Sequence, residues 1–402
     1  MKRKNAISAV LAVTMLAAAI LPGCGADKDS GKTEIEILQY KPEAATYFDK
    51  VEDEFNATHD DIHLTISSPN DASTIMRTRF VREDYPDIIG IGGDINYSYY
   101  VDADILADVS DYPGLSDIKQ SYVDILEALE ITPKDGTYGV PYVANAAGIL
   151  YNKDMFEEHG WQIPESWDEL IDLCQEIQSE GILPFYFGFR DTWTCLAPWN
   201  SLAVDLAPAD TCKQVNAGET TFSDEYRETA EKCMELVSYG PDDPFAYGYN
   251  DACTAFANGE SAMYPIGSYA VPQILSVNPD MNIDSFVTPG NDDASKNTLN
   301  SGVDLMFAVN KDAAYEVLDF LLEDENIQAY IDDQNAVPCK EGDFDLAPML
   351  DGMKPYIESG NMTDYQDHYY PSEMAVDAQI QTFLINKDVD AFLAKFDQDW
   401  QR

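Results

Sequence analysis

The chain has 402 residues, of which 45% are hydrophobic and 11% aromatic, so its length and composition predict two packed α/β lobes rather than a disordered acidic chain. Its 73 acidic and 24 basic side chains give a formal net charge of −49 at pH 7. Because phosphates and anionic lipid heads are bound by clustered lysine and arginine, this charge argues against nucleic acid or an anionic bilayer surface as a partner. It is typical of a soluble exported protein, and it leaves a cationic solute such as a polyamine open as a ligand.

The N-terminal segment has the pattern of an export signal. Lys2-Arg3-Lys4 form a basic region, an apolar run covers residues 6–20, and Leu21-Pro22-Gly23-Cys24 follows. This pattern resembles bacterial lipoprotein signals, in which cleavage precedes the cysteine and its thiol receives a diacylglycerol. The resemblance implies a signal peptide at 1–23 and a tether at 24–32 that begins with a lipid-bearing Cys24. An ordinary signal peptide, cut at another small residue, is the alternative.

The cysteines that follow Cys24 do not form a metal-binding pattern. They are Cys174, Cys195, Cys212, Cys233, Cys253 and Cys339. None lies in a C-x-x-C motif, and their spacing fits no zinc site. The sequence therefore predicts buried thiols or one or two disulfides and no bound metal, and it cannot choose among the possible pairings.

The first part of the chain reads as a β-α-β unit followed by a further strand. Residues 34–38 and 62–66 alternate as strands should, and apolar side chains recur at helical spacing over 48–55. Asp87-Ile88-Ile89-Gly90-Ile91 predicts a strand of the buried kind found in parallel sheets. That strand ends at Gly92-Gly93-Asp94, which places a carboxylate where open α/β sheets bind ligands. The glycines lack the spacing of a dinucleotide fingerprint.

A continuous stretch from Asp135 to Asp172 predicts a passage of the chain from one lobe to the other. A Gly- and Pro-containing hairpin at 138–142 leads into an apolar strand, and a helix begins at Ser166. Ser166 and Glu169 have the spacing of a capping box, and Gly181 is expected to end this helix.

Strand and helix patterns continue to alternate up to the C-terminus. Strands are predicted near 262–264, 283–287 and 301–310, and helices over 226–237, 251–256, 317–321, 324–331, 374–384 and 389–400. This alternation predicts α/β layers.

Several segments, in this order and spacing, resemble one protein family. They are Tyr85-Pro86-Asp87-Ile88, Tyr138-Gly139-Val140-Pro141-Tyr142, Leu150-Tyr151-Asn152-Lys153-Asp154-Met155-Phe156, Ser166-Trp167-Asp168-Glu169-Leu170, Phe256-Ala257-Asn258-Gly259-Glu260-Ser261-Ala262-Met263 and Asn335-Ala336-Val337-Pro338. The chain is similar to the extracellular solute-binding proteins of ATP-binding-cassette (ABC) importers, in the carbohydrate-binding family that includes maltose-binding protein. The resemblance covers essentially the whole mature chain.

The resemblance implies a fold, a set of partners and a location. The fold would be that of type II periplasmic binding proteins: two α/β lobes, joined by hinge crossovers, that close on a ligand. Lobe 1 would comprise 33–142 and 287–330, and lobe 2 would comprise 143–286 and 336–402. A monomer without cofactor would deliver its carbohydrate ligand to permease subunits served by a cytoplasmic ATPase. It would be lipid-anchored outside the cytoplasmic membrane, on a Gram-positive surface rather than in a periplasm.

A sugar site needs aromatic platforms for C–H faces and carboxylate or amide groups for paired hydrogen bonds. Such residues at predicted strand ends are Tyr40, Asp94, Asn145, Asp191, Trp193, Trp199, Tyr269 and Asp304. The resemblance places Trp193 and Tyr269 at positions of stacking aromatics. Core packing is the alternative for the tryptophans, and an ion pair with Arg190 is the alternative for Asp191. Tyr369 and Tyr370 are further possibilities.

A glycoside hydrolase that uses two carboxylates is the rival from another class. With 73 acidic residues, carboxylate pairs arise by chance and cannot support that reading. The sequence has no Gly-x-Ser-x-Gly, His-Glu-x-x-His or Gly-x-x-x-x-Gly-Lys motif. His59 and His63 flank a loop and a strand start, where surface placement is expected rather than metal binding. The sequence thus predicts a binding protein without catalytic residues.

Overall fold

A computed structural model describes residues 31–311 and 314–400. The signal peptide, Cys24 and most of the tether expected from the sequence lie outside the described residues. Within the described ranges, no helix is long and apolar enough to cross a membrane.

The N-terminal sheet has six strands in the order β11-β4-β10-β3-β1-β2. These strands are β1 (Thr33–Gln39), β2 (Ile62–Ser67), β3 (Ile88–Ile91), β4 (Val140–Ala144), β10 (Val303–Val309) and β11 (Val337–Pro338). β1 runs parallel to β2 and β3, whereas β10 is antiparallel to β3 and β4. Every residue of β3 is buried, as expected for a strand that is covered on both faces.

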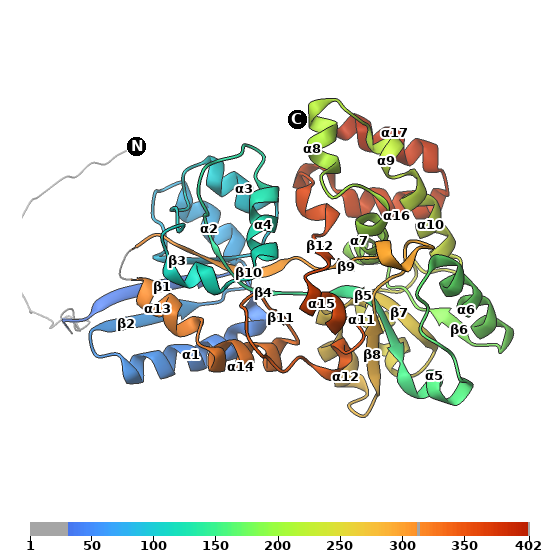
Figure 1. Cartoon of the computed structure of the whole chain (residues 1–402), viewed down its shortest axis with the longest axis horizontal. Helices are drawn as coiled ribbons and strands as arrows, with labels where there is room; N and C mark the ends of the chain where they lie inside the picture. Colours follow the sequence, from blue (N-terminus) through green and yellow to red (C-terminus); the bar gives the residue numbers. More distant parts are fainter. Residues whose placement is uncertain (1–30, 312–313, 401–402) are drawn as a thin grey trace, which may run out of the picture.

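Helices cover both faces of this sheet. They are α1 (Ala45–Thr58), α2 (Ala72–Phe80), α3 (Ile95–Asp102), α4 (Gln120–Leu129), α13 (Tyr315–Leu321) and α14 (Asp324–Gln334). α2, α3 and α4 lie on one face, and α1, α13 and α14 on the other (Figure 1). We call this sheet with its helices the first lobe.

The other sheet has the order β12-β9-β5-β7-β6, and β8 also pairs with β5. Its strands are β5 (Ala147–Asn152), β6 (Leu183–Phe185), β7 (Ser261–Gly267), β8 (Ile283–Phe286), β9 (Leu299–Asn300) and β12 (Met362–Thr363). Its helices are α5 (Lys153–His159), α6 (Trp167–Ser179), α7 (Leu196–Leu206), α8 (Thr211–Ala217), α9 (Phe222–Glu225), α10 (Arg227–Val237), α11 (Tyr249–Ala257), α12 (Val271–Val277), α15 (Lys354–Ser359), α16 (Val376–Asn386) and α17 (Val389–Asp399). We call this group the second lobe; it stands beside the first lobe in Figure 1.

Short 3-10 helices occur in the connections. They are η1 (Pro42–Ala44), η2 (Pro113–Asp117), η3 (Thr192–Cys195), η4 (Ser268–Ala270), η5 (Ala294–Lys296), η7 (Pro348–Leu350), η8 (Gln366–Tyr369) and η9 (Ser372–Met374). Of these, η1, η3, η4 and η8 carry residues of the candidate site described below.

The helix expected at Ser166 illustrates how local sequence sets the elements. The Ser166 hydroxyl accepts a hydrogen bond from the Glu169 amide (3.3 Å), which confirms the predicted N-cap of α6. The Glu169 carboxylate bonds the Glu165 amide (2.8 Å) rather than the amide of the cap residue itself. The helix buries Leu170, Leu173 and Ile177 on one face, which fixes it against the second sheet.

The chain changes sheet three times. It passes from β4 to β5 between Ala144 and Ala147, from β9 to β10 between Asn300 and Val303, and from β11 to β12 over 338–362. The first two passages are bonded to each other, since the Ser301 hydroxyl donates to the Asn145 carbonyl oxygen (2.7 Å). The lobe boundaries expected from the sequence stay a prediction. Sheet membership attaches the stretch from 287 to 300 to the second lobe, because β9 pairs with β5.

The six cysteines of the described chain are all buried, and no disulfide joins them. Of the two alternatives left by the sequence, the structure therefore supports buried thiols. Burial raises the pKa of the Cys233 and Cys253 thiols to about 12, so both are protonated and unreactive at neutral pH.

Candidate functional site

Among the described residues, three well-formed cavities lie between the lobes, and each takes its lining from both. The Asn145 pocket, of about 360 Å³, combines Lys41, Asn145 and Asp304 of the first-lobe side with Tyr249 and Tyr269 of the second lobe. Its size lies at the lower end of the range of roughly 300 to 1,000 Å³ that is usual for small-molecule sites.

The second cavity, the Asp94 pocket, has a volume of about 330 Å³. Asp94 and Asn96 line it from the first lobe, and Leu196, Asp367 and His368 line it from the second. Asp94 is placed there because it caps α3 at the end of β3, where its carboxylate accepts a hydrogen bond from the Asn96 amide (2.8 Å).

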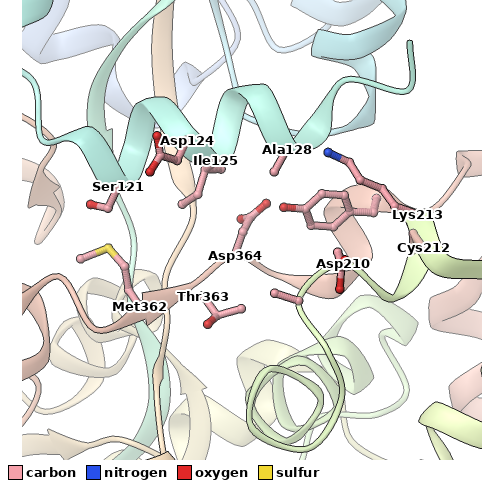
Figure 2. Close-up of a pocket in the computed structure, with 12 residues that line it drawn as sticks. Ser121, Asp124, Ile125, Ala128, Asp210, Cys212, Lys213, Met362, Thr363 and Asp364 are labelled. Carbon is pink, nitrogen blue, oxygen red and sulfur yellow. The ribbon is translucent and has the colours of Figure 1, made fainter. Parts of the chain in front are cut away.

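The third cavity, the Ser121 pocket, has a volume of about 290 Å³. Figure 2 shows Ser121 and Asp124 on α4, facing Thr363 and Asp364 of the second lobe across the gap. Its lining includes Tyr369 but none of the eight residues predicted for the ligand site. We therefore place the candidate site at the other two pockets.

Exposed aromatic rings adjoin these two pockets. Trp193 is 42% exposed and Tyr269 37% exposed, whereas most aromatic side chains of the described chain are buried. Their ring centroids lie 6.3 Å apart, and the ring of Tyr249 lies 5.0 Å from that of Trp193. These rings form an open apolar surface on the second lobe. Tyr249 was not predicted as a site residue. The one feature of the sequence that could have indicated it is its position directly after Gly248, at the start of α11.

Asp191 positions this aromatic surface instead of lining a pocket. Its carboxylate accepts a hydrogen bond from the Tyr249 amide (2.7 Å), which ties the start of η3 to the start of α11. The alternative pairing with Arg190 is wrong, because the Arg190 guanidinium binds the Asp251 carboxylate at 2.9 Å. The hydrogen bond between Asp191 and the Tyr249 amide therefore keeps Trp193 and Tyr249 next to each other.

Partly buried polar groups follow β1 on the first-lobe side. The Lys41 ammonium forms an ion pair with the Asp304 carboxylate, and it lies 3.4 Å from Glu43. Burial lowers the pKa of Lys41, but the Asp304 charge outweighs this effect, so the net shift is upward. Tyr40 donates a hydrogen bond to the Asp304 carbonyl oxygen (2.5 Å), and burial raises its pKa well above the ordinary value. The Tyr40 hydroxyl group is therefore uncharged at neutral pH and acts as a hydrogen-bond donor.

In the Asp94 pocket, His368 is surrounded by carboxylates. Its Nδ1 lies 2.8 Å from an oxygen of Asp364, while Asp367 accepts a hydrogen bond from the Asn200 amide group (2.7 Å). Burial lowers the pKa of His368, but Asp364, Asp367 and Asp94 together raise it to about 10, so the ring is a cation at neutral pH. Asp367 and His368 were not predicted from the sequence, because no motif marks the loop before the last helices.

The structure brings most of the predicted site residues together. Asn145, Tyr269 and Asp304 line the Asn145 pocket, Asp94 lines the Asp94 pocket, Tyr40 bonds Asp304, and Trp193 packs beside Tyr269.

Besides Asp191, Trp199 lies outside the pockets, and the alternative of core packing applies to it. It is fully buried in the second lobe, where its ring contacts those of Tyr226 and Phe392 at centroid distances of 5.4 Å. It therefore cannot touch a ligand in the pockets. Tyr370 is buried but lines the Asp94 pocket.

Comparison with known proteins identifies the family. Residues 40–328 match the family of bacterial extracellular solute-binding proteins. The multiple sugar-binding protein of Streptococcus mutans is 28% identical over 316 residues, which cover 75% of this chain and 73% of that protein. The melibiose/raffinose/stachyose-binding protein MelE of Bacillus subtilis is 28% identical over 203 residues, which cover 48% of this chain and 45% of that protein.

Solved structures show the same fold. The apo form of RafE from Streptococcus pneumoniae has a TM-score of 0.80 at 23% identity, covering 92% of this chain and 97% of that one. RafE in complex with raffinose has a TM-score of 0.76 at 24% identity, covering 91% and 98%. The likeness confirms the predicted architecture of two α/β lobes with a type II solute-binding fold. Since the family match also spans most of the chain, the protein belongs to the bacterial extracellular solute-binding proteins, which bind substrates and are not enzymes.

Proposed function

We propose that the protein captures a sugar, in particular an oligosaccharide, between its lobes and delivers it to an ABC importer. The observation that carries this proposal is the exposed Trp193–Tyr269 pair beside two polar pockets that both lobes line. Aromatic faces suit the C–H faces of sugar rings, and carboxylate and amide groups suit their hydroxyl groups. Relatives named for multiple sugars and for melibiose, raffinose and stachyose support the same ligand class.

A cationic solute such as a polyamine is the alternative, because the chain is strongly acidic. Two carboxylates near the pockets already have cationic partners. The Asp304 carboxylate pairs with Lys41, and the Asp364 carboxylate pairs with His368. At these two carboxylates a polyamine would have to displace the cation or share the carboxylate with it, whereas a sugar hydroxyl group can donate to a carboxylate that keeps its partner.

Calorimetry with the mature protein tests the proposal against the alternative. Raffinose, stachyose, their component monosaccharides and spermidine are titrated separately at the same ionic strength. We expect heat of binding with at least one saccharide and none with spermidine. Binding of spermidine with silent saccharides would replace the proposal with the cationic ligand, and new reducing ends during incubation would indicate an enzyme.

We further propose that the mature chain is anchored by a diacylglycerol on Cys24 at the extracellular face of the cytoplasmic membrane. There it would act as a monomer and meet the permease subunits and their cytoplasmic ATPase. The Leu21–Cys24 segment after an apolar run supports this proposal. Two acyl chains give stable membrane attachment, whereas a single chain gives only marginal binding.

Replacement of Cys24 by alanine tests the anchor. We expect the wild-type protein to fractionate with membranes of the expressing bacterium, and the C24A variant to appear mainly in the soluble exported fraction. Equal release of both proteins would contradict lipidation and favour the ordinary signal peptide. Binding of saccharide by the released variant is the control for folding, since Cys24 precedes both lobes in the sequence.

A further inference from the structure

The Ser121 pocket and the Asn145 pocket lie at opposite ends of a row of strands at the crossing between the lobes. In the second sheet this row has the order β12, β9, β5 and β7, and its strands are in register at Thr363, Asn300, Ala147 and Gly267. Residues of β12 line the Ser121 pocket, whereas Tyr269, two residues after β7, lines the Asn145 pocket. A hinge rotation that closes the lobes at the Tyr269 end of the row therefore moves them apart at the Thr363 end.

The C-terminal end of α4, which borders the Ser121 pocket, is a favourable place for a cation. The dipole of a helix favours positive charge at this end, yet the last turn of α4 contains no basic residue. Glu130, the C-cap residue, adds a carboxylate that is only 4% exposed. Its Oε2 accepts a hydrogen bond from the Lys134 amide (2.9 Å), whereas Oε1 has no hydrogen-bond partner among the described residues.

Lys213 of the second lobe brings a cation to this end of α4. Its side chain lines the Ser121 pocket and extends towards Ala128, in the last turn of α4 (Figure 2). Lys213 itself lies in the first turn of α8, where the dipole of its own helix does not favour a positive charge. The position of this lysine is therefore explained by the opposite lobe and not by α8.

The charge of Lys213 acts on Glu130 across the gap between the lobes. Burial raises the pKa of Glu130, and the charges of Glu127 and Asp102 add to this rise. The hydrogen bond from the Lys134 amide and the charge of Lys213 lower the same pKa, and the net shift is upward. Lys213 thus stabilises the charged form of a carboxylate in the other lobe.

Lys213 is not placed to touch a ligand in the candidate site. It lines neither the Asn145 pocket nor the Asp94 pocket. Its attraction to α4 depends on the distance between the lobes at the Thr363 end of the row, which increases as they close at the Tyr269 end. Closure on a ligand must therefore weaken this attraction.

We propose that Lys213 and the C-terminal end of α4 form an electrostatic contact that stabilises the arrangement of the lobes in Figure 1 and opposes their closure. The inference rests on the proposed sugar function and adds to it a residue that sets affinity without touching the ligand. Because the ligand must shift the lobes against this contact, removing the contact increases the apparent affinity.

Calorimetry of Lys213 variants tests this inference with a saccharide that the wild type binds. We expect K213Q to bind it about two- to fivefold more tightly, the scale of losing a cation at a helix C-terminus. K213R keeps the charge and should bind as the wild type does. Wild-type affinity should also rise with salt concentration, since screening weakens the contact, and the affinity of K213Q should change less.

Two further variants separate the contact from general charge effects. K296Q removes an exposed lysine of the second lobe that lies outside the three pockets between the lobes, and it should bind as the wild type does. E130Q keeps the acceptor that the Lys134 amide uses. In the E130Q background, the gain from K213Q should be smaller, because the two side chains interact.

Binding by K213Q that equals or falls below that of the wild type would overturn the contact and leave sugar binding intact. A wild type that binds no saccharide would refute the proposed function itself. The contact is then tested in the ligand-free protein by carbon-13 NMR titration of the Glu130 carboxyl group. Its pKa should be higher in K213Q than in the wild type, and an unchanged pKa would overturn the inference.

Discussion

Replacing Trp193 by alanine is expected to weaken oligosaccharide binding by about 1 to 3 kcal/mol, the scale of losing a large aromatic anchor from a binding surface. The side chain is 42% exposed and packs beside Tyr249 and Tyr269 instead of entering the core. Its removal should therefore take away ligand contact and leave the second lobe folded. Calorimetric dissociation constants of wild type and W193A, measured with the same saccharide, check this prediction.

Two further variants make the test of Trp193 specific. W193F keeps an aromatic face and should recover part of the lost affinity. Y85A removes an aromatic side chain that is similarly exposed, at 39%, but lies outside the three pockets between the lobes, and it should bind as the wild type does. An unchanged dissociation constant for W193A would remove Trp193 from the site.

Replacing Trp199 by alanine is expected to lower the free energy of unfolding by about 3 to 5 kcal/mol, the usual cost of a Trp-to-Ala change in a packed core. The ring is fully buried, and its edges meet the rings of Tyr226 and Phe392. The substitution would leave a cavity in the aromatic core between α7, α10 and α17 that the neighbouring rings cannot close. Urea unfolding followed by far-UV circular dichroism measures the loss.

The comparison with W193A separates the two tryptophans. W199A should lose stability, and its folded fraction should keep a near-normal affinity. W193A should lose affinity with a stability change within about 0.5 kcal/mol, as is usual for exposed positions. If W199A unfolds at the same urea concentration as the wild type, the packing described for Trp199 is incorrect.

Local patterns were sufficient to predict most of the fold. The alternation in 62–66 and the helical spacing of Phe48, Val51 and Phe55 correspond to β2 and α1. Such patterns work because burial on one face of an element repeats with the period of its backbone. The N-cap of α6 was predicted in the same way, because Ser166 caps this helix through its side chain.

The site was harder to predict, because it depends on which side chains are left over once the core has formed. Trp193 and Trp199 stand six positions apart in one aromatic segment, and no local pattern ranks them. Trp193 lies in η3 and remains exposed, whereas Trp199 lies in α7, which packs against α10 and other elements of the second lobe. Asp367 and His368 become neighbours of Asp94 only through tertiary structure.

Gly302, in the passage from β9 to β10, has a mechanical consequence. A Cβ atom at this position would stand 2.3 Å from Oδ1 of Asp364 and 2.9 Å from Cε1 of His368, so only glycine lets the loop rest directly on the crossing strand. The passage from β9 to β10 and the loop that carries Asp364 and His368 therefore lie in direct contact, and a side chain at position 302 would push that loop away from the passage between the two sheets.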